Sequence, residues 1–266
     1  SKFAKSWMIE KYGLVETWLE GLGDSPIVVD AGCGAGMSGL LYFESVLQKI
    51  RYLGVDVSKA VDVASDRFFE KGLPASFIQA DIQALPLMNE TVDMVFSEGV
   101  LHHTDNTRTA LSSVVRILRP GGRILFYVYA RKGPVREFTD DLIRDKMQEL
   151  SPEAGWQEME KLTALGKILG DLNIEIDIKE PITLLDIPAG RISIQRLFYW
   201  YFCKSYYRPE MTLDEMNHIN FDWFAPKNAI RQSPEQVRDW CDQLGLKVER
   251  FIVETAGITV VARKEG

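Results

Sequence analysis

The chain has 266 residues, of which 46% are hydrophobic and 26% charged, with a net charge of −7. This composition is typical of a globular protein with a sizeable core, and its acidity argues against a general nucleic-acid binder. Its three cysteines are far apart in the sequence, so we expect no disulfide framework, no metal site and a cytoplasmic location. No apolar run reaches the roughly 18 residues of a membrane span, and no signal peptide is visible. The chain begins at Ser1 without a methionine, and we expect native residues to precede it.

Strands alternate with helices along the first half of the chain. Apolar residues at helical spacing predict helices over residues 5–22, 38–48, 59–71 and 106–118. Short apolar runs predict strands over residues 27–30, 52–56, 76–81, 92–97 and 123–129. This alternation predicts an α/β fold with a parallel sheet between helices.

The end of the chain has equally clear signals. Ser233 is a helix N-cap, Pro234 follows at the first helical position, and Gln236 completes a capping box. Gly245 should end this helix. The strands predicted over 246–253 and 257–262 are too close together for a helical crossover, so they should form an antiparallel hairpin.

About a hundred residues separate the fifth strand from the last helix, which is too long for an ordinary connection. Candidate helices cover 135–149, 152–169 and 192–207. We therefore predict a core of residues 1–130 and 233–266, and a mostly helical lid of residues 131–232 that recognises substrate at the carboxyl edge of the sheet.

A glycine-rich loop follows the first strand. Asp30 ends the strand, and Gly32, Gly34 and Gly36 follow on alternate positions. Glycine allows a sharp turn close to a ligand, and ligands of open α/β sheets bind at this edge. Met37 occupies the third glycine position of a dinucleotide loop, and Asp30 would repel a pyrophosphate but attract an amino group. These departures favour S-adenosylmethionine, although a tight turn without a ligand is the alternative.

Two further acids end the next two strands. Asp56, followed by Val57, can accept hydrogen bonds from both ribose hydroxyls, and Ser58 is the better helix cap, which should leave Asp56 free. A helix N-cap role for Asp56 is the alternative. Asp81 can accept from an adenine amino group, while Ile82 covers the ring.

On these motifs the chain resembles the class I S-adenosylmethionine-dependent methyltransferases. Asp30 and the three glycines match the first motif, and Asp81-Ile82 before Leu85-Pro86 matches a later one. The resemblance implies a Rossmann-like seven-stranded sheet of order 3-2-1-4-5-7-6 whose last strand is antiparallel. It also implies that Ser97 and Glu98 flank the methionine part of the cofactor, and that the product is S-adenosylhomocysteine.

His102 and His103 are the candidate catalytic residues. A histidine can remove a proton from an attacking hydroxyl or amine, but adjacent residues cannot both point inward. Packing under the cofactor or capping the next helix is the alternative. Cys33 we interpret as a small buried filler.

Residues 191–208 hold four basic residues, seven aromatic residues and no acid. They are either a buried aromatic helix with a wet basic face, or a substrate wall in which aromatics stack and a cation holds an anionic group. The candidate substrate-binding residues are Tyr129, Arg131, Tyr199 and Trp223, the last in the segment before the final helix.

We therefore expect a methyltransferase that acts on a small molecule with an anionic or aromatic group, by in-line transfer to oxygen. Two alternatives are an N- or C-methyltransferase and a cofactor-binding protein that transfers no methyl, such as a regulatory subunit or an enzyme of other sulfonium chemistry. A nucleic-acid substrate is disfavoured, because residues 131–232 hold 14 basic and 17 acidic residues.

Overall fold

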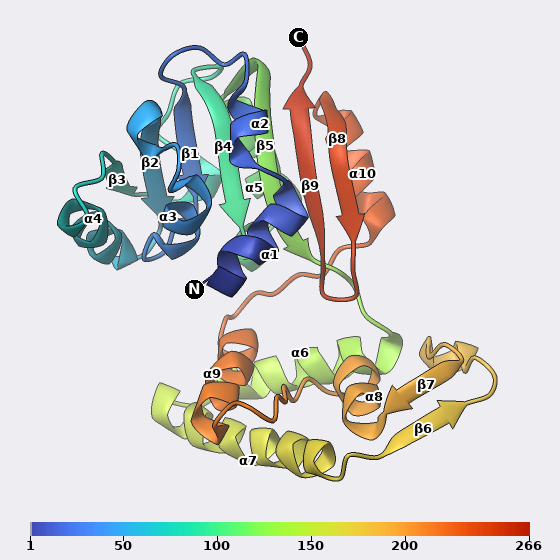
Figure 1. Cartoon of the computed structure of the whole chain (residues 1–266). Coiled ribbons are helices and arrows are strands. Elements are labelled where there is room, and N and C mark those ends of the chain that lie inside the picture. The colour runs from blue at the N-terminus through green and yellow to red at the C-terminus, as the bar shows by residue number, and fades with distance from the viewer. Residues whose placement is uncertain (1) are drawn as a thin grey trace. The chain divides into compact units, whose positions relative to one another are not determined.

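The computed structural model describes the backbone of residues 2–266 and the side chains from residue 5 onward. The chain forms two compact units (Figure 1). Unit 1 comprises the chain up to Ala130 together with Ile230–Gly266, and unit 2 comprises Arg131–Ala229.

Unit 1 is built on a seven-stranded sheet of order β3-β2-β1-β4-β5-β9-β8. The first five strands are parallel, while β9 is antiparallel to β5 and pairs with β8 as a hairpin. Counting the two hairpin strands as six and seven, this is the predicted order 3-2-1-4-5-7-6, which is confirmed. The strands are β1 (Ile27–Ala31), β2 (Arg51–Asp56), β3 (Ser76–Gln79), β4 (Val92–Glu98), β5 (Leu118–Tyr129), β8 (Leu246–Val253) and β9 (Gly257–Lys264).

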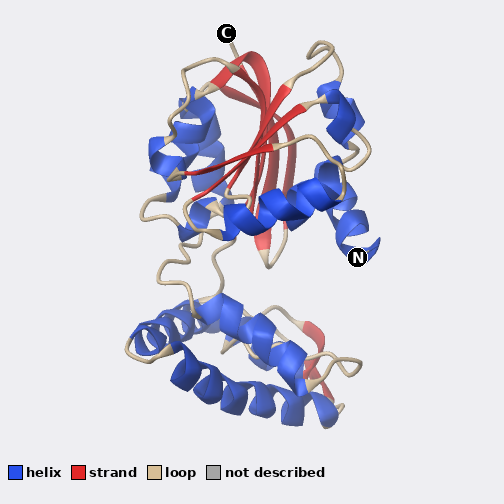
Figure 2. Ribbon diagram, turned by 90° about the vertical axis from the view of Figure 1, so that its left-hand side faces the viewer, coloured by secondary structure: helices blue, strands red, loops and turns tan. Residues whose placement is uncertain are grey.

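Helices cover both faces of this sheet (Figure 2). Side chains alternate between two cores, so that Val95 of β4 packs with α5 and α10 while Phe96 packs with α1–α4. Burial on both faces explains why these strands are almost continuously apolar. The helices are α1 (Lys2–Tyr12), α2 (Val15–Leu19), α3 (Met37–Phe43), α4 (Ala60–Glu70), α5 (Thr107–Arg116) and α10 (Pro234–Gln243), with 3₁₀ turns at Leu47–Lys49, Ile82–Ala84 and Leu101–His103.

Several predicted boundaries of unit 1 were wrong. The helix expected over 5–22 is two helices, because the chain turns at Gly13 with φ of +86°. The helix expected to reach residue 48 ends at Phe43, and β5 begins earlier than predicted, at Leu118. The last helix has the predicted capping box of Ser233 and Gln236.

Unit 2 contains α6 (Pro134–Gln148), α7 (Pro152–Asp171), α8 (Ile194–Tyr201) and α9 (Leu213–Phe224). It also contains a hairpin of β6 (Glu175–Ile178) and β7 (Gly190–Ser193) that the sequence did not indicate. The helix expected over 192–207 is only α8. Residues 222–224, expected in a segment before the last helix, form the last turn of α9. A capping box of Thr212 and Glu215 lies at the N-terminus of this helix.

Candidate cofactor site

The glycine loop between β1 and α3 has a backbone that requires glycine. Gly32, Gly34 and Gly36 all lie in the left-handed region, with φ of +86°, +50° and +75°. A Cβ at Gly32 would lie 2.2 Å from Val100 Cγ1, so no other residue fits there. The Gly32 amide donates to the carbonyl oxygen of Val55 in β2 at 2.7 Å, which fixes the loop above the sheet edge.

Asp56 at the end of β2 is bound to this loop. Its Oδ2 accepts from the Gly34 amide at 2.9 Å, and its Oδ1 accepts from the Ser58 amide at 2.8 Å and the Ser58 hydroxyl at 2.7 Å. The expectation that Ser58 leaves Asp56 free is therefore wrong. Helix α4 begins at Ala60, so Asp56 is not its N-cap. These bonds orient the carboxylate beside the loop, and the neighbouring Val57 side chain is 68% exposed.

Asp81 caps the 3₁₀ turn that follows β3, where its Oδ1 accepts from the Gln83 amide at 2.8 Å. Ile82, the residue expected to cover an adenine ring, has its side chain buried in the core together with Leu85. Asp81 is itself exposed at the same sheet edge as Asp56. The adenine contacts of this pair remain a prediction.

Asp30 lies under the loop rather than on its surface. Its side chain is buried and accepts a hydrogen bond from the Tyr52 hydroxyl. Burial raises the pKa of Asp30 from its usual 3.8 to about 7, against the lowering effect of the Tyr52 hydrogen bond, and the charge of Asp56 adds to the rise. A Cβ at Gly39 would lie 2.0 Å from the Tyr52 hydroxyl oxygen, so α3 passes over this pair only because residue 39 is glycine.

Glu98 at the end of β4 is a second acid of this kind. The Tyr12 hydroxyl of α1 donates to its Oε2. Burial raises the pKa of Glu98 from 4.5 to about 7, the Tyr12 hydrogen bond opposes that rise, and the charge of Asp30 adds to it. The preceding residue, Ser97, is buried and donates to the Ala31 carbonyl oxygen at 2.9 Å. Nothing in the sequence marked Tyr12 or Tyr52 as partners of these acids.

The two histidines differ in exposure. His102 is fully buried, with its ring centroid 3.7 Å from that of Tyr129, whereas His103 is half-buried, with its ring 5.5 Å from the same tyrosine. Thus Tyr129, predicted to bind substrate, lies beside both predicted catalytic residues. The main chain of His102 and of Tyr129 also pairs with the segment that leads into α10. The Ile230 amide donates to the carbonyl oxygen of His102, and the Gln232 amide donates to that of Tyr129.

Tyr199 and Trp223 come together within unit 2. Arg136 of α6 lies against both rings, with Cζ 5.3 Å from the Tyr199 centroid and 5.8 Å from that of Trp223. Trp223 is buried and its Nε1 donates to Asp140 Oδ2 at 3.0 Å. Arg131 is exposed at the beginning of the unit.

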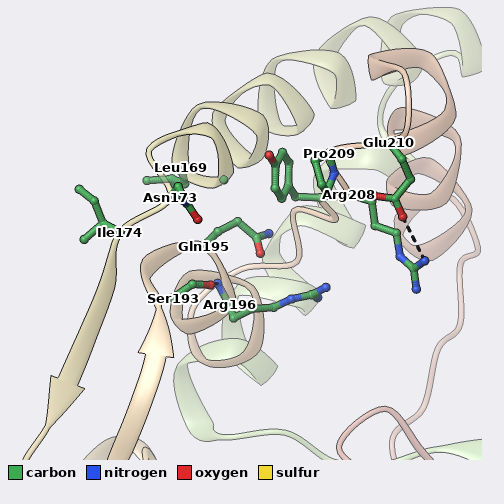
Figure 3. A pocket seen from close by; sticks show the side chains of 11 residues that line it. Leu169, Asn173, Ile174, Ser193, Gln195, Arg196, Arg208, Pro209 and Glu210 are labelled. Atoms are coloured by element: carbon green, nitrogen blue, oxygen red, sulfur yellow. Dashed lines mark hydrogen bonds and ion pairs between the residues drawn. The ribbon is translucent and has the colours of Figure 1, made fainter.

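Unit 2 also has a pocket of about 360 Å³ that contains none of the predicted residues (Figure 3). Its wall combines the end of α7, the beginning of α8 and the loop after it, and Figure 3 shows Gln195 and Arg196 on the side of α8. Within this wall Arg208 Nη1 lies 3.3 Å from Glu210 Oε1.

Three further observations concern metal ligands, membrane helices and the cysteines. Among the residues that the structure describes, no group of three or more His, Cys, Asp or Glu side chains could hold a metal ion. No described helix is both long and apolar enough to cross a membrane. All three cysteines are buried, and burial raises the pKa of the Cys33 thiol above its usual range, as expected for an inert filler.

Comparison with known proteins agrees with this geometry. Residues 29–126 match the family described as a methyltransferase domain. The chain is 28% identical over 171 residues to phthiotriol/phenolphthiotriol dimycocerosates methyltransferase 1 of Mycobacterium ulcerans (strain Agy99), covering 62% of this chain and 61% of the relative. It is 33% identical over 117 residues to the tRNA (carboxymethyluridine(34)-5-O)-methyltransferase ALKBH8 of Macaca fascicularis, covering 42% of this chain and 16% of that protein.

Among solved structures, the chain is similar in fold to Burkholderia thailandensis 1,6-didemethyltoxoflavin-N1-methyltransferase, whose structure contains S-adenosylhomocysteine. The TM-score is 0.51 at 13% identity, over 100% of this chain and 83% of the other. The chain spans less than two thirds of the length of the curated relatives that it matches first. Residues 29–126 therefore form a methyltransferase domain, and the sheet order and the glycine loop are those of the class I S-adenosylmethionine-dependent methyltransferase fold.

Proposed function

We propose that this protein transfers a methyl group from S-adenosylmethionine to an oxygen atom of a small molecule. The observation that carries the proposal is the arrangement at one sheet edge, where the glycine loop of β1 is bonded to Asp56 of β2 and Glu98 ends β4. Open α/β sheets bind their ligands at this edge.

The residues present fit this cofactor. Asp30 and Glu98 are two acids at this sheet edge, and burial raises the pKa of each to about 7. S-adenosylmethionine has an ammonium group and a sulfonium, and no phosphate that these acids would repel. Asp56 has acceptor oxygens beside a loop in which a Cβ at Gly34 would meet no atom within 4 Å, which leaves room for a nucleoside.

The bound cofactor would supply an electrophilic methyl group on its sulfonium. The protein would hold the ribose at Asp56, with Val57 alongside, and the adenine at Asp81 and Ile82. Glu98 would hold the methionine end, while Ser97, whose buried hydroxyl donates to the Ala31 carbonyl oxygen, would support the strand end beneath it. Alignment of the acceptor with the methyl, and exclusion of water around them, is the main contribution that such a site makes to the rate.

His103 is the better candidate for a proton acceptor than His102. His103 is half-buried and therefore has some access to solvent and ligand, whereas His102 is fully buried against Tyr129. A hydroxyl acceptor must lose a proton as it attacks, and an imidazole is suited to accept it near neutral pH. His102 would then act by packing against the ring of Tyr129.

We assign substrate recognition to unit 2, while Tyr129 lies beside His103 within unit 1. The rings of Tyr199 and Trp223 both lie against the guanidinium group of Arg136, which supports a site for a substrate with an anionic or aromatic group. The charge of unit 2 does not favour RNA, although one relative carries the name of a tRNA methyltransferase.

Two measurements test the proposal. Calorimetry with S-adenosylhomocysteine should show binding to the wild type and to Asp62→Ala, an exposed acid of α4, and much weaker binding to Asp56→Ala. Incubation with methyl-labelled cofactor and a metabolite extract should then yield a labelled product in which NMR finds the methyl on oxygen. Absence of cofactor binding would refute the assignment of the site, and binding without any labelled product would favour a protein that transfers no methyl.

A further inference from the structure

A cluster of positive charges surrounds the indole ring of Trp223 inside unit 2. Lys204 Nζ lies 4.2 Å from the ring centroid, Lys132 Nζ lies 5.6 Å from it, and Arg136 Cζ lies 5.8 Å from it. The three cations come from the loop after α8, the segment before α6 and α6 itself. We call these four residues the Trp223 cluster.

The buried carboxylate beside the cluster, that of Asp140, already accepts hydrogen bonds from other residues. Asp140 is fully buried, and its Oδ1 accepts from Arg136 Nε at 2.8 Å while its Oδ2 accepts from Trp223 Nε1 at 3.0 Å. Asp222 is exposed and its Oδ2 lies 3.5 Å from Nε2 of His218. Neither acid is bonded to Lys204.

Lys204 is the unusual member of the cluster. Its side chain is 7% exposed, yet its Nζ makes no hydrogen bond or ion pair with any residue that the structure describes. Lysines are almost never buried without a partner, because removing an ammonium group from water is costly. Attraction to the Trp223 ring recovers only part of this cost.

The surroundings of Lys204 oppose its positive charge. Burial lowers the pKa of its ammonium group from 10.5 to about 7, Arg136 and Lys132 lower it further by repulsion, and Asp140 and Asp222 raise it. An apolar side chain of similar length would fill this space without these costs. A lysine here is useful if a negatively charged group is bound beside it.

We propose that Lys204 binds the oxyanion of the substrate, a carboxylate or phosphate group, against Trp223. This inference rests on the proposed function in that it names the chemical class of the methyl acceptor. The oxyanion would give the Lys204 ammonium group the hydrogen-bond acceptor that it lacks among the described residues. The acceptor of the methyl group would then be an acidic small molecule rather than a neutral lipid.

The test compares the full-length wild type with Lys204→Met and with Lys179→Met, which changes an exposed lysine of the same unit. Calorimetry uses benzoate and phenyl phosphate as probes at pH 7.5, and benzamide as the uncharged analogue. Benzoate, phenyl phosphate or both should bind the wild type and Lys179→Met, and should bind Lys204→Met roughly 10- to 100-fold more weakly, as expected for one charge-assisted hydrogen bond. Benzamide should not bind. The stronger of the two charged probes identifies the kind of oxyanion.

A second measurement does not depend on the folding of a variant. Benzoate remains ionised between pH 6 and pH 9, so its affinity for the wild type should fall across this range as the Lys204 ammonium group loses its proton. Equal benzoate affinity in the wild type and Lys204→Met, absence of binding by both charged probes, or an affinity that does not change with pH would each overturn the proposal. S-adenosylhomocysteine, titrated into the same samples, should bind all three proteins equally. Its failure to bind the wild type would refute the proposed function separately.

Discussion

Replacing Asp30 by asparagine should flatten the pH dependence of the stability measured without cofactor. In the folded protein the pKa of Asp30 is raised from 3.8 to about 7, because the carboxyl is buried under the glycine loop. Between pH 4 and pH 7 the carboxyl of Asp30 is therefore protonated in the folded state but ionised in the unfolded state. The contribution of Asp30 to stability is fully present below pH 4 and is lost as the pH rises through 7.

The size of the effect follows from the pKa difference. Three pKa units correspond to about 4 kcal/mol at 1.36 kcal/mol per unit. Glu98 titrates over the same range, and the charge of Asp30 raises its pKa, so the titrations of the two carboxyls overlap. We therefore expect Asp30→Asn to remove about 2–4 kcal/mol of the pH-dependent change in unfolding free energy.

Urea unfolding at pH 5 and pH 8 measures this change. The wild type and Asp24→Asn, which alters an exposed acid near β1, should lose the same amount of stability between the two pH values. Asp30→Asn should lose less by about 1–3 kcal/mol, because only the two pKa units between pH 5 and the folded-state pKa of about 7 fall inside this range. Parallel behaviour of all three proteins would refute the buried, protonated state of Asp30.

The same reasoning applies to cofactor binding. A bound ammonium and sulfonium would favour the ionised forms of Asp30 and Glu98, so S-adenosylmethionine should bind with release of protons and more tightly at pH 8 than at pH 5.5. Calorimetry in two buffers of different ionisation enthalpy counts the protons. Proton uptake on binding would contradict the assignment of these acids to the cofactor site.

Three further predictions concern single positions. Asp56→Ala should weaken binding of S-adenosylhomocysteine by roughly 1.5–3 kcal/mol, measured by calorimetry, since it removes charged acceptors from the ribose hydroxyls; unchanged affinity would show that the ribose lies elsewhere. Gly32→Ala should lower the free energy of unfolding by about 3 kcal/mol or more, because its Cβ would lie 2.2 Å from Val100 Cγ1 at a φ of +86°. Gly21→Ala is its control, with φ of +79° but no atom within 4 Å, and should cost about 1 kcal/mol; equal costs would exclude the steric explanation. Arg136→Met should destabilise the protein by roughly 3–5 kcal/mol in urea unfolding, because it leaves a fully buried carboxylate without its cation, and adding the matching change of that carboxylate to an uncharged residue should restore much of the loss.

Much of the fold of unit 1 could be predicted because its signals are local. Apolar runs that end in glycine or an acid, and the capping box at Ser233, determine strands and helices within a few residues of themselves. Asp30, Asp56 and Asp81 are predicted for the same reason, since each ends a predicted strand and parallel strands end at one edge, whereas Glu98 is implied by the family resemblance. The break at Gly13 was missed, because the apolar spacing continues across it and only the backbone turns.

Tertiary packing decided the environments of these residues. Tyr12 reaches Glu98 from 86 positions away in the chain, and Tyr52 reaches Asp30 from 22. The raised pKa values therefore depend on how helices α1 and α3 and strands β1, β2 and β4 bury these pairs, which no local pattern encodes. The sequence of unit 2 likewise indicated an abundance of aromatic and basic residues, but the burial of Lys204 against Trp223 exists only because three segments meet there. The sequence by itself thus determined the type of sheet and the position of the glycine loop, while folding determined which charges are buried and paired, because burial depends on neighbours that are distant in the chain.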